Sequence, residues 1–180
     1  MFIFDKYNKG FLLMGSVIKR NEFMVAALVE AQKALSEGEI PVGCIITFKN
    51  EIIARGRNKR EQCRNALGHA EISAIDEACK KLSDWRLSEC DLYVTLEPCM
   101  MCAGAILNAR IRRLYFGAYA SKENYTGYSG VGSVEEILLG VHDRPEIYGG
   151  ICEEECEEIL KTFFNRLRKN GKRGDNHEHQ

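Results

Sequence analysis

The apolar positions near the start of the chain predict an amphipathic helix followed by a β-hairpin. Apolar residues recur at spacings of three and four over 24–35, which is the period of one helix face. Asn21 fits the N-cap of this helix, and Gly38 fits its end. Two short β-prone runs follow at 42–48 and 51–54, separated by a Lys-Asn pair. A two-residue break between strand patterns is typical of a hairpin.

Helix and strand patterns alternate along the rest of the chain. The predicted elements are a helix at 72–82, a strand at 91–96, a helix at 103–108, a strand at 113–117 and a helix at about 153–169. The segment 118–132, rich in turn-forming residues and tyrosines, is expected to be a loop. Because a helix between two strands acts as a crossover, the expected fold is α/β: a mixed sheet with helices on both faces, in three α/β/α layers.

These patterns fit one domain with short extensions. A chain of 180 residues, 45% of them hydrophobic, is long enough to build one buried core. The expected organisation is a disordered N-terminal extension over 1–20, a domain over 21–170 and a polar tail over 171–180. Charged residues interrupt the apolar start of the chain, so neither a signal peptide nor a membrane anchor is expected.

Charge and cysteine content narrow the class of protein. The formal net charge is −1 with 28% charged residues, which excludes a highly charged disordered chain and nucleic-acid binding through overall charge alone. The eight cysteines are spread from Cys44 to Cys156, with no secretory segment before them. This distribution predicts reduced thiols and a cytoplasmic protein rather than a disulfide framework.

Two short motifs, HAE at 69–71 and PCMMC at 98–102, combine the residue types of a catalytic zinc site. One imidazole and two thiolates supply three ligands of a tetrahedral zinc ion and leave one position open. Both motifs lie at the start of predicted helices, where the partial positive charge favours thiolates. Glu71 lies two residues beyond the histidine, so it fits a group that moves protons at the metal rather than a ligand.

His69, Cys99 and Cys102 are therefore the candidate zinc ligands, although each motif alone also fits a different role. Cys-x-x-Cys also occurs in redox pairs and structural zinc sites, and His-x-Glu occurs by chance. Their combination in this order favours the catalytic site. Cys63 would be a fourth ligand that closes the site, which is the main alternative. Other cysteines fit small apolar side chains, namely Cys44, Cys79, Cys152 and Cys156.

These motifs and their surroundings resemble the bacterial tRNA-specific adenosine deaminases, a family of the zinc-dependent cytidine/deoxycytidylate deaminase superfamily. The resemblance covers about residues 22–169. It rests on the stretches GEIPVG (38–43), HAE (69–71), WRL (85–87), LYVTLEPCMMCAGA (92–105) and FF (163–164). It implies a cytidine-deaminase-like fold, one Zn²⁺ per subunit bound by His69, Cys99 and Cys102, and Glu71 as the proton shuttle.

The resemblance also implies an activity, a substrate and an assembly. Members of this family are hydrolases that convert adenosine to inosine at the wobble position of tRNA, acting on the anticodon stem-loop as homodimers, and no membrane association is expected. The implied substrate contacts are Asn58, Pro41, Val42, Leu96 and Pro98. The run at 120–124 departs from the family pattern, so the resemblance leaves the substrate range set by 118–145 open.

Local charge supports an RNA substrate. Residues 55–64 contain five basic residues and one acid just before the HAE motif, where phosphates flanking a flipped-out base would lie. Residues 161–173 contain six basic residues and no acid, but acidic residues begin the same predicted helix. Acids at the start of a helix and bases at its end complement the helix dipole, which explains this cluster about as well as RNA binding does. The candidate RNA contacts are Arg57, Lys59, Arg60, Arg64, Lys122, Phe163, Phe164 and Arg166.

Two other functions share these residues. A deaminase of a free nucleobase or nucleoside (cytosine, guanine or adenosine) would need the same metal site but no basic clusters. A zinc-stabilised RNA-binding module without catalysis would give Glu71 no role. Deamination of tRNA is therefore the leading hypothesis.

Overall fold

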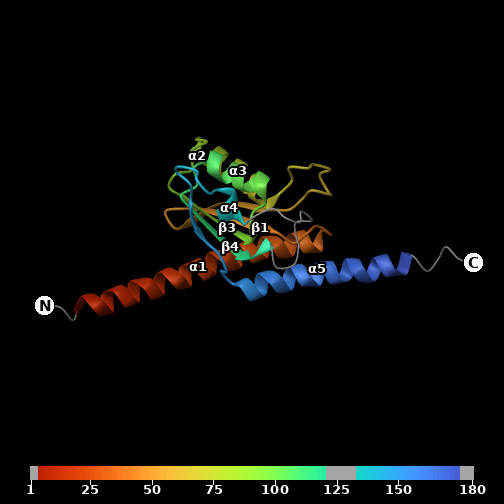
Figure 1. Cartoon of the computed structure of the whole chain (residues 1–180), viewed down its shortest axis with the longest axis horizontal. Helices are drawn as coiled ribbons and strands as arrows, with labels where there is room; N and C mark the ends of the chain where they lie inside the picture. The colour runs from red at the N-terminus through yellow and green to blue at the C-terminus, as the bar shows by residue number, and fades with distance from the viewer. Residues whose placement is uncertain (1–3, 121–132, 175–180) are drawn as a thin grey trace, which may run out of the picture.

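The computed structural model describes residues 4–120 and 133–174, which form a mixed five-stranded sheet between two layers of helices (Figure 1). The elements are α1 (Phe4–Ser36), β1 (Gly43–Phe48), β2 (Glu51–Arg57), α2 (Ala70–Leu82), β3 (Cys90–Leu96), α3 (Met100–Asn108), β4 (Arg113–Ala118), α4 (Val134–Ile137), β5 (Glu146–Tyr148) and α5 (Glu153–Gly174). The three-layer α/β fold expected from the sequence is confirmed.

The strands lie in the order β2-β1-β3-β4-β5. Strand β1 is antiparallel to β2 and β3, whereas β4 is parallel to both β3 and β5. The hairpin between β1 and β2 turns at Lys49 and Asn50, which both have positive φ, as tight hairpin turns favour. Helix α3 is the crossover that makes β3 and β4 parallel. The sheet is therefore mixed, as the alternation of patterns predicts.

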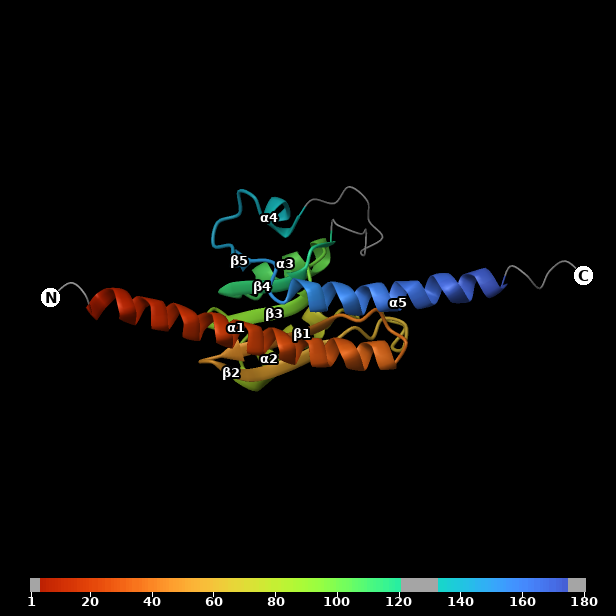
Figure 2. The same cartoon turned by 90° about the horizontal axis from the view of Figure 1, so that it is seen from below.

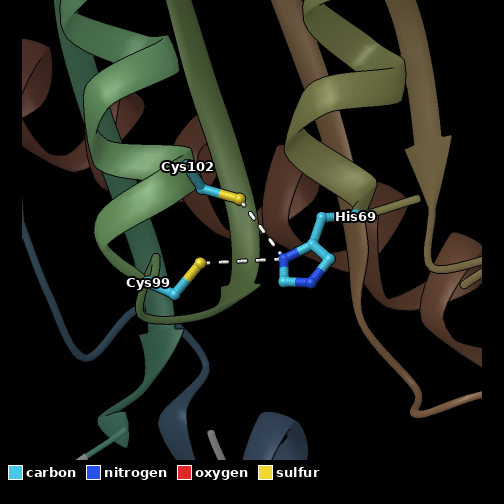
Figure 3. Close-up of side chains that lie close together, drawn as sticks. All are labelled: His69, Cys99 and Cys102. Atoms are coloured by element: carbon cyan, nitrogen blue, oxygen red, sulfur yellow. Dashed lines mark hydrogen bonds between the residues drawn. The ribbon is translucent and has the colours of Figure 1, made fainter. Parts of the chain in front are cut away.

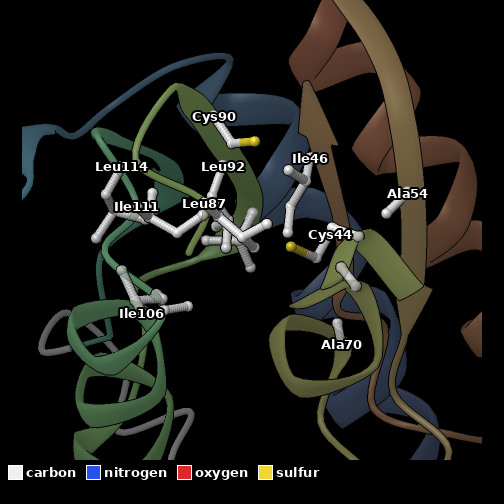
Figure 4. Packing of buried hydrophobic residues seen from close by; sticks show 14 of the residues in the cluster. Cys44, Ile46, Ala54, Ala70, Leu87, Cys90, Leu92, Ile106, Ile111 and Leu114 are labelled. Carbon is white, nitrogen blue, oxygen red and sulfur yellow. The ribbon is translucent and has the colours of Figure 1, made fainter. Parts of the chain in front are cut away.

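Helices α1 and α5 cover one face of the sheet, and α2 and α3 cover the other (Figures 1 and 2). Successive side chains of β1 point to opposite faces. Ile45 packs with Met24 of α1 and Leu160 of α5, whereas Cys44 and Ile46 belong to the cluster under α2 and α3 (Figure 4). Each face of the sheet thus forms a hydrophobic cluster with the pair of helices that covers it.

Strand β2 and helix α2 approach so closely that only glycine fits between them. A Cβ atom at Gly56 would lie 2.0 Å from the carbonyl oxygen of Ala70 and 2.8 Å from the amide nitrogen of Ala74. The first turn of α2 is therefore held directly against the sheet. His69, the residue before that turn, is fixed with it.

Helix α1 starts earlier than the sequence pattern predicts. It begins at Phe4 rather than at Asn21, so the expected N-cap is wrong and most of the expected extension over 1–20 is helical. No proline interrupts this segment, and a helix already nucleated on the sheet propagates through such residues at little cost. The division into a domain over 21–170 and a tail over 171–180 stays a prediction.

The other predicted elements match to within a few residues. Strand β2 and helix α5 end later than predicted, and α2 and α3 begin earlier. The elements α4 and β5 had no predicted counterpart because they are too short to show a period. The expected loop at 118–132 lies outside the described residues beyond Ala120. Across the described ranges, no helix is both long enough and apolar enough to span a membrane.

Candidate active site

Two helix N-termini carry the three candidate metal ligands. His69 is the N-cap of α2 and Cys99 is the N-cap of α3; both have extended backbones, and neither side chain makes a capping hydrogen bond. Cys102 follows in the first turn of α3 and is fully buried. Because these two N-cap side chains make no hydrogen bond to their own helices, they can point toward each other between α2 and α3, as Figure 3 shows.

The three side chains have the spacing that a tetrahedral zinc ion requires. The Nδ1 atom of His69 is 3.7 Å from the Sγ of Cys99 and 3.4 Å from the Sγ of Cys102. Zinc bonds of about 2.0 Å to nitrogen and about 2.3 Å to sulfur at tetrahedral angles place these atoms about 3.5 Å apart. The three ligand atoms all lie within 4.8 Å of one another. This donor set therefore fits zinc.

Contacts within the cluster favour a thiolate at Cys99. The hydrogen bond with Cys102 lowers the pKa of the Cys99 thiol to about 4, and a hydrogen bond with His69 acts in the same direction. The bond to Cys99 in turn raises the pKa of His69. The N-terminus of α3 adds partial positive charge beside the sulfur. Cys99 is thus held in the form that binds metal ions.

Glu71 lies in the first turn of α2 and is only 4% exposed. Its side chain lines the same cavity as His69 and Cys99, yet Glu71 is not part of the ligand cluster. Burial raises the pKa of its carboxyl group. A buried carboxyl group that lies beside a ligand set, but outside it, suits proton transfer.

A cavity of about 440 Å³ opens beside the cluster, within the usual size range of small-molecule sites. Its lining includes the apolar side chains of Ile40, Leu67 and Met101, and Arg60 also borders it. Pro41 lies outside the lining. The other residues expected to contact substrate do line the cavity: Asn58, Val42, Leu96 and Pro98.

Two buried carboxylates near this cavity have roles that the sequence did not reveal. Glu97 lines the cavity and accepts hydrogen bonds from the backbone N–H groups of Val134, at 2.9 Å, and Ala120, at 3.0 Å. Glu39 is 1% exposed and accepts three hydrogen bonds from the segment after β2. The only sequence signal for either was an acid among mostly apolar neighbours, in GEIPVG and in TLEP.

Arg57, a candidate RNA contact, is engaged in an ion pair. Its guanidinium group donates two hydrogen bonds to the carboxylate of Glu37, at 2.9 and 2.7 Å, and lies 3.9 Å from Glu30. These acids come from the end of α1 and just beyond it, so the pairing was not visible in the local charge count. No ion pair is formed, within the described part of the chain, by the other basic candidates of this segment: Lys59, Arg60 and Arg64.

The candidate RNA contacts on α5 differ in their surroundings. Phe163 is 8% exposed, and its ring packs edge-on against that of Phe164 at 5.3 Å. Phe164 is partly buried against the core under α1 and α5. Both rings therefore take part in packing, and their contact with RNA stays a prediction. Arg166 is exposed, and Lys122 lies outside the described residues.

Cys63, the possible fourth ligand, is exposed and lies outside the cluster of His69, Cys99 and Cys102. All eight cysteines are free thiols. Of the four cysteines expected to be small apolar side chains, Cys44 and Cys156 are buried, whereas Cys79 and Cys152 are only partly buried. Cys90 is buried as well. Within the described residues, the structure thus brings the three candidate ligands together without Cys63.

The Cys63→Ala variant is expected to keep one zinc ion per chain and unchanged thermal stability, because the replaced thiol contacts none of the three ligands. Metal content measured by atomic emission, beside a Cys99→Ala variant that removes a ligand, checks this expectation. Loss of zinc from Cys63→Ala would mean a closed site with four protein ligands.

The chain is similar to known deaminases over most of its length. The family described as MafB19-like deaminase matches residues 18–168. The tRNA-specific adenosine deaminase of Bacillus subtilis (strain 168) is 43% identical over 150 residues, which cover 83% of this chain and 91% of the relative.

Solved structures share the fold. A structure from studies of A-to-I editing by tRNA:A34 deaminases at the wobble position has a TM-score of 0.69 and 42% identity, and the match covers 77% of this chain and 99% of that one. A guanine deaminase from Bacillus subtilis has a TM-score of 0.56 and 35% identity, over 59% of this chain and 69% of that one.

Proposed function

The chain belongs to the tRNA-specific adenosine deaminase family, and on that premise we propose that it converts adenosine to inosine at the wobble position of tRNA. The reaction is a hydrolysis in which water replaces the amino group of the base and ammonia leaves. The observation that carries the proposal is the cluster of His69, Cys99 and Cys102 next to a cavity that the buried carboxyl group of Glu71 also lines.

The metal proposed for the cluster is zinc, one ion per chain, held by His69, Cys99 and Cys102. Its support is the donor set and the nitrogen–sulfur distances of 3.7 and 3.4 Å. When bound, zinc supplies a Lewis acid that acidifies water and polarises the reacting group. Two thiolates offset the charge of the ion, so a nearby carboxylate is needed to take the proton.

Glu71 is the proposed proton carrier. Its carboxylate takes a proton from the attacking water and delivers it to the ring nitrogen beside the reacting carbon as the carbon–oxygen bond forms. A second transfer moves the proton of the newly attached hydroxyl group to the exocyclic amine, so that the carbon–nitrogen bond breaks, the carbonyl group forms and ammonia leaves. The raised pKa caused by burial suits a group that must both accept and return protons.

The cavity is the proposed pocket for the flipped-out base, with Asn58, Val42, Leu96 and Pro98 as its contacts. Their support is that all four line the cavity beside the metal-ligand cluster. Phosphate contacts are proposed for the basic side chains of the adjoining segment that form no ion pair in the described part of the chain: Lys59, Arg60 and Arg64.

A homodimer and a cytoplasmic location are also proposed. Support for the dimer comes from two apolar side chains at the cavity that are largely exposed, Leu67 at 55% and Met100 at 60%, because exposed apolar surface often marks an interface. Support for the compartment is the presence of eight free thiols and no disulfide, which suits a reducing environment.

Affinity for an anticodon stem-loop is expected to fall steeply as salt concentration rises, because each phosphate contact releases counterions. The Arg60→Ala/Arg64→Ala variant should bind more weakly and lower the slope of log K against log salt by about 0.7 per lost contact. Fluorescence anisotropy over a salt series measures this slope. Zinc content should not change.

The matched control is Lys80→Ala/Lys81→Ala, which removes the same charge from the last turn of α2, at the other end of that helix from His69. Its slope should equal that of the wild type. A wild type with no measurable affinity for the stem-loop would contradict the RNA substrate. That result would favour a free-base deaminase, the alternative that the similarity to guanine deaminase supports.

A further inference from the structure

A buried carboxylate outside the metal cluster holds one wall of the cavity. Glu39 follows α1 and is 1% exposed. Its Oε2 accepts hydrogen bonds from the side-chain Nδ2 of Asn58, at 3.3 Å, and from the backbone N–H of Glu61, at 3.2 Å. Its Oε1 accepts one from the backbone N–H of Gln62, at 2.7 Å. All three donors belong to the segment that follows β2.

The part of this segment that Glu39 binds, residues 58–62, includes two side chains of the cavity wall, Asn58 and Arg60. It is also tied to the residue just before β1, because the backbone N–H of Asn58 donates to the carbonyl oxygen of Val42 at 3.0 Å. Val42 also lines the cavity. The Glu39 carboxylate therefore sits where the two chain segments that form this wall are joined.

An ionised carboxylate only accepts hydrogen bonds, and this sets the orientation of the Asn58 amide. The NH₂ group of Asn58 must face Glu39, which leaves the amide oxygen to point elsewhere. Asn58 is 6% exposed, so its side chain has little room to take another orientation. A neutral partner that both donates and accepts would allow the amide to turn over.

We propose that Glu39 is a positioning residue for substrate recognition: its buried carboxylate fixes the amide of Asn58 in the orientation that meets the base. This role rests on the proposed function, in which Asn58 contacts the target base. Glu39 itself does not line the cavity, so it acts through Asn58 and the backbone that follows it.

The Glu39→Gln variant tests this role because glutamine keeps the shape but replaces one acceptor by a donor. If the NH₂ group of Gln takes the place of Oε2, it faces the donors of Asn58 and Glu61, and inversion of the Asn58 amide removes the first of these two conflicts. If it takes the place of Oε1, it faces the backbone N–H of Gln62, and the stretch that carries Asn58 must shift. We expect kcat/KM for a wobble-adenosine stem-loop to fall about tenfold, the scale of one hydrogen bond to a charged group. Zinc content should stay at the wild-type value.

A double-mutant cycle separates positioning from a general structural effect. Asn58→Ala alone should lower kcat/KM about tenfold, and the double variant Glu39→Gln/Asn58→Ala should fall no further. If Glu39 acted independently of Asn58, the two losses would multiply to about a hundredfold. That multiplicative result would overturn the proposal, as would a Glu39→Gln variant with wild-type kcat/KM.

The matched control is Asp91→Asn. Asp91 is another buried acid, at the start of β3, and it forms an ion pair with Arg112. Its effect and that of Asn58→Ala should multiply.

If Glu39→Gln does not fold, Glu39→Asp takes its place in the cycle, since it keeps an acceptor but draws it away from the amide. If the wild type turned over only a free base, the proposed function would fail, whereas the same cycle run with that base would still decide the role of Glu39.

Discussion

The Glu71→Gln variant is expected to retain its metal and to lose about 10³-fold in kcat, which is the scale of general acid–base catalysis. Glutamine preserves the size of a side chain that is 4% exposed but cannot carry a proton. The three candidate ligands remain in place because Glu71 is not part of their cluster. Ammonia release and metal content, measured on the same preparation, check both halves of this expectation.

The matched control for this variant is Glu77→Gln, on the same helix. The Glu77 carboxylate accepts a hydrogen bond from the backbone of Arg55 and does not line the cavity, so kcat should be unchanged. Loss of zinc from Glu71→Gln would identify Glu71 as a ligand instead of a proton carrier. Turnover close to that of the wild type would remove it from the reaction.

The Cys102→Ala variant is expected to lose both zinc and activity, because only two of the three ligands remain. Zinc that binds the folded chain but not the unfolded chain raises the free energy of unfolding by about 4 kcal/mol when it is present at about 1,000 times its dissociation constant. Losing that contribution should lower the midpoint of thermal unfolding by about 10 °C. Calorimetry of the zinc-loaded proteins measures the shift.

The matched control here is Cys44→Ala. Both thiols are 0% exposed, so both substitutions leave a small cavity in the protein, but Cys44 belongs to the hydrophobic core in β1. This variant should keep its zinc and its activity, with only the stability cost of the lost packing. Wild-type zinc content in both Cys44→Ala and Cys102→Ala would exclude Cys102 as a ligand.

Much of the fold was predictable because its signals are local. The two-residue turn between β1 and β2 and the alternation of strands with α2 and α3 appear directly in the pattern of apolar residues. The start of α1 was not predictable from periodicity, since regular spacing of apolar residues begins only at Met24, twenty residues after the helix starts at Phe4. The short elements α4 and β5 carry too few residues for any period.

In the candidate site, too, the features with a local sequence signal were predictable and those without one were not. His69, Cys99 and Cys102 lie in two short motifs with fixed spacing, so the sequence alone identified the cluster that the structure brings together. The partners of Glu39 and Arg57 could not be predicted because they lie about twenty residues away in the sequence. A charge count within one segment therefore did not show that Arg57 is engaged by Glu37.

The most direct test of the central claim is to supply the zinc-loaded protein with two kinds of substrate and to measure ammonia and inosine. One is an anticodon stem-loop with adenosine at the wobble position, and the other is a set of free bases: adenine, guanine and cytosine. We expect one ammonia and one inosine per stem-loop and no release from the free bases. Ammonia from a free base with an unchanged stem-loop would contradict the assignment of tRNA as the substrate.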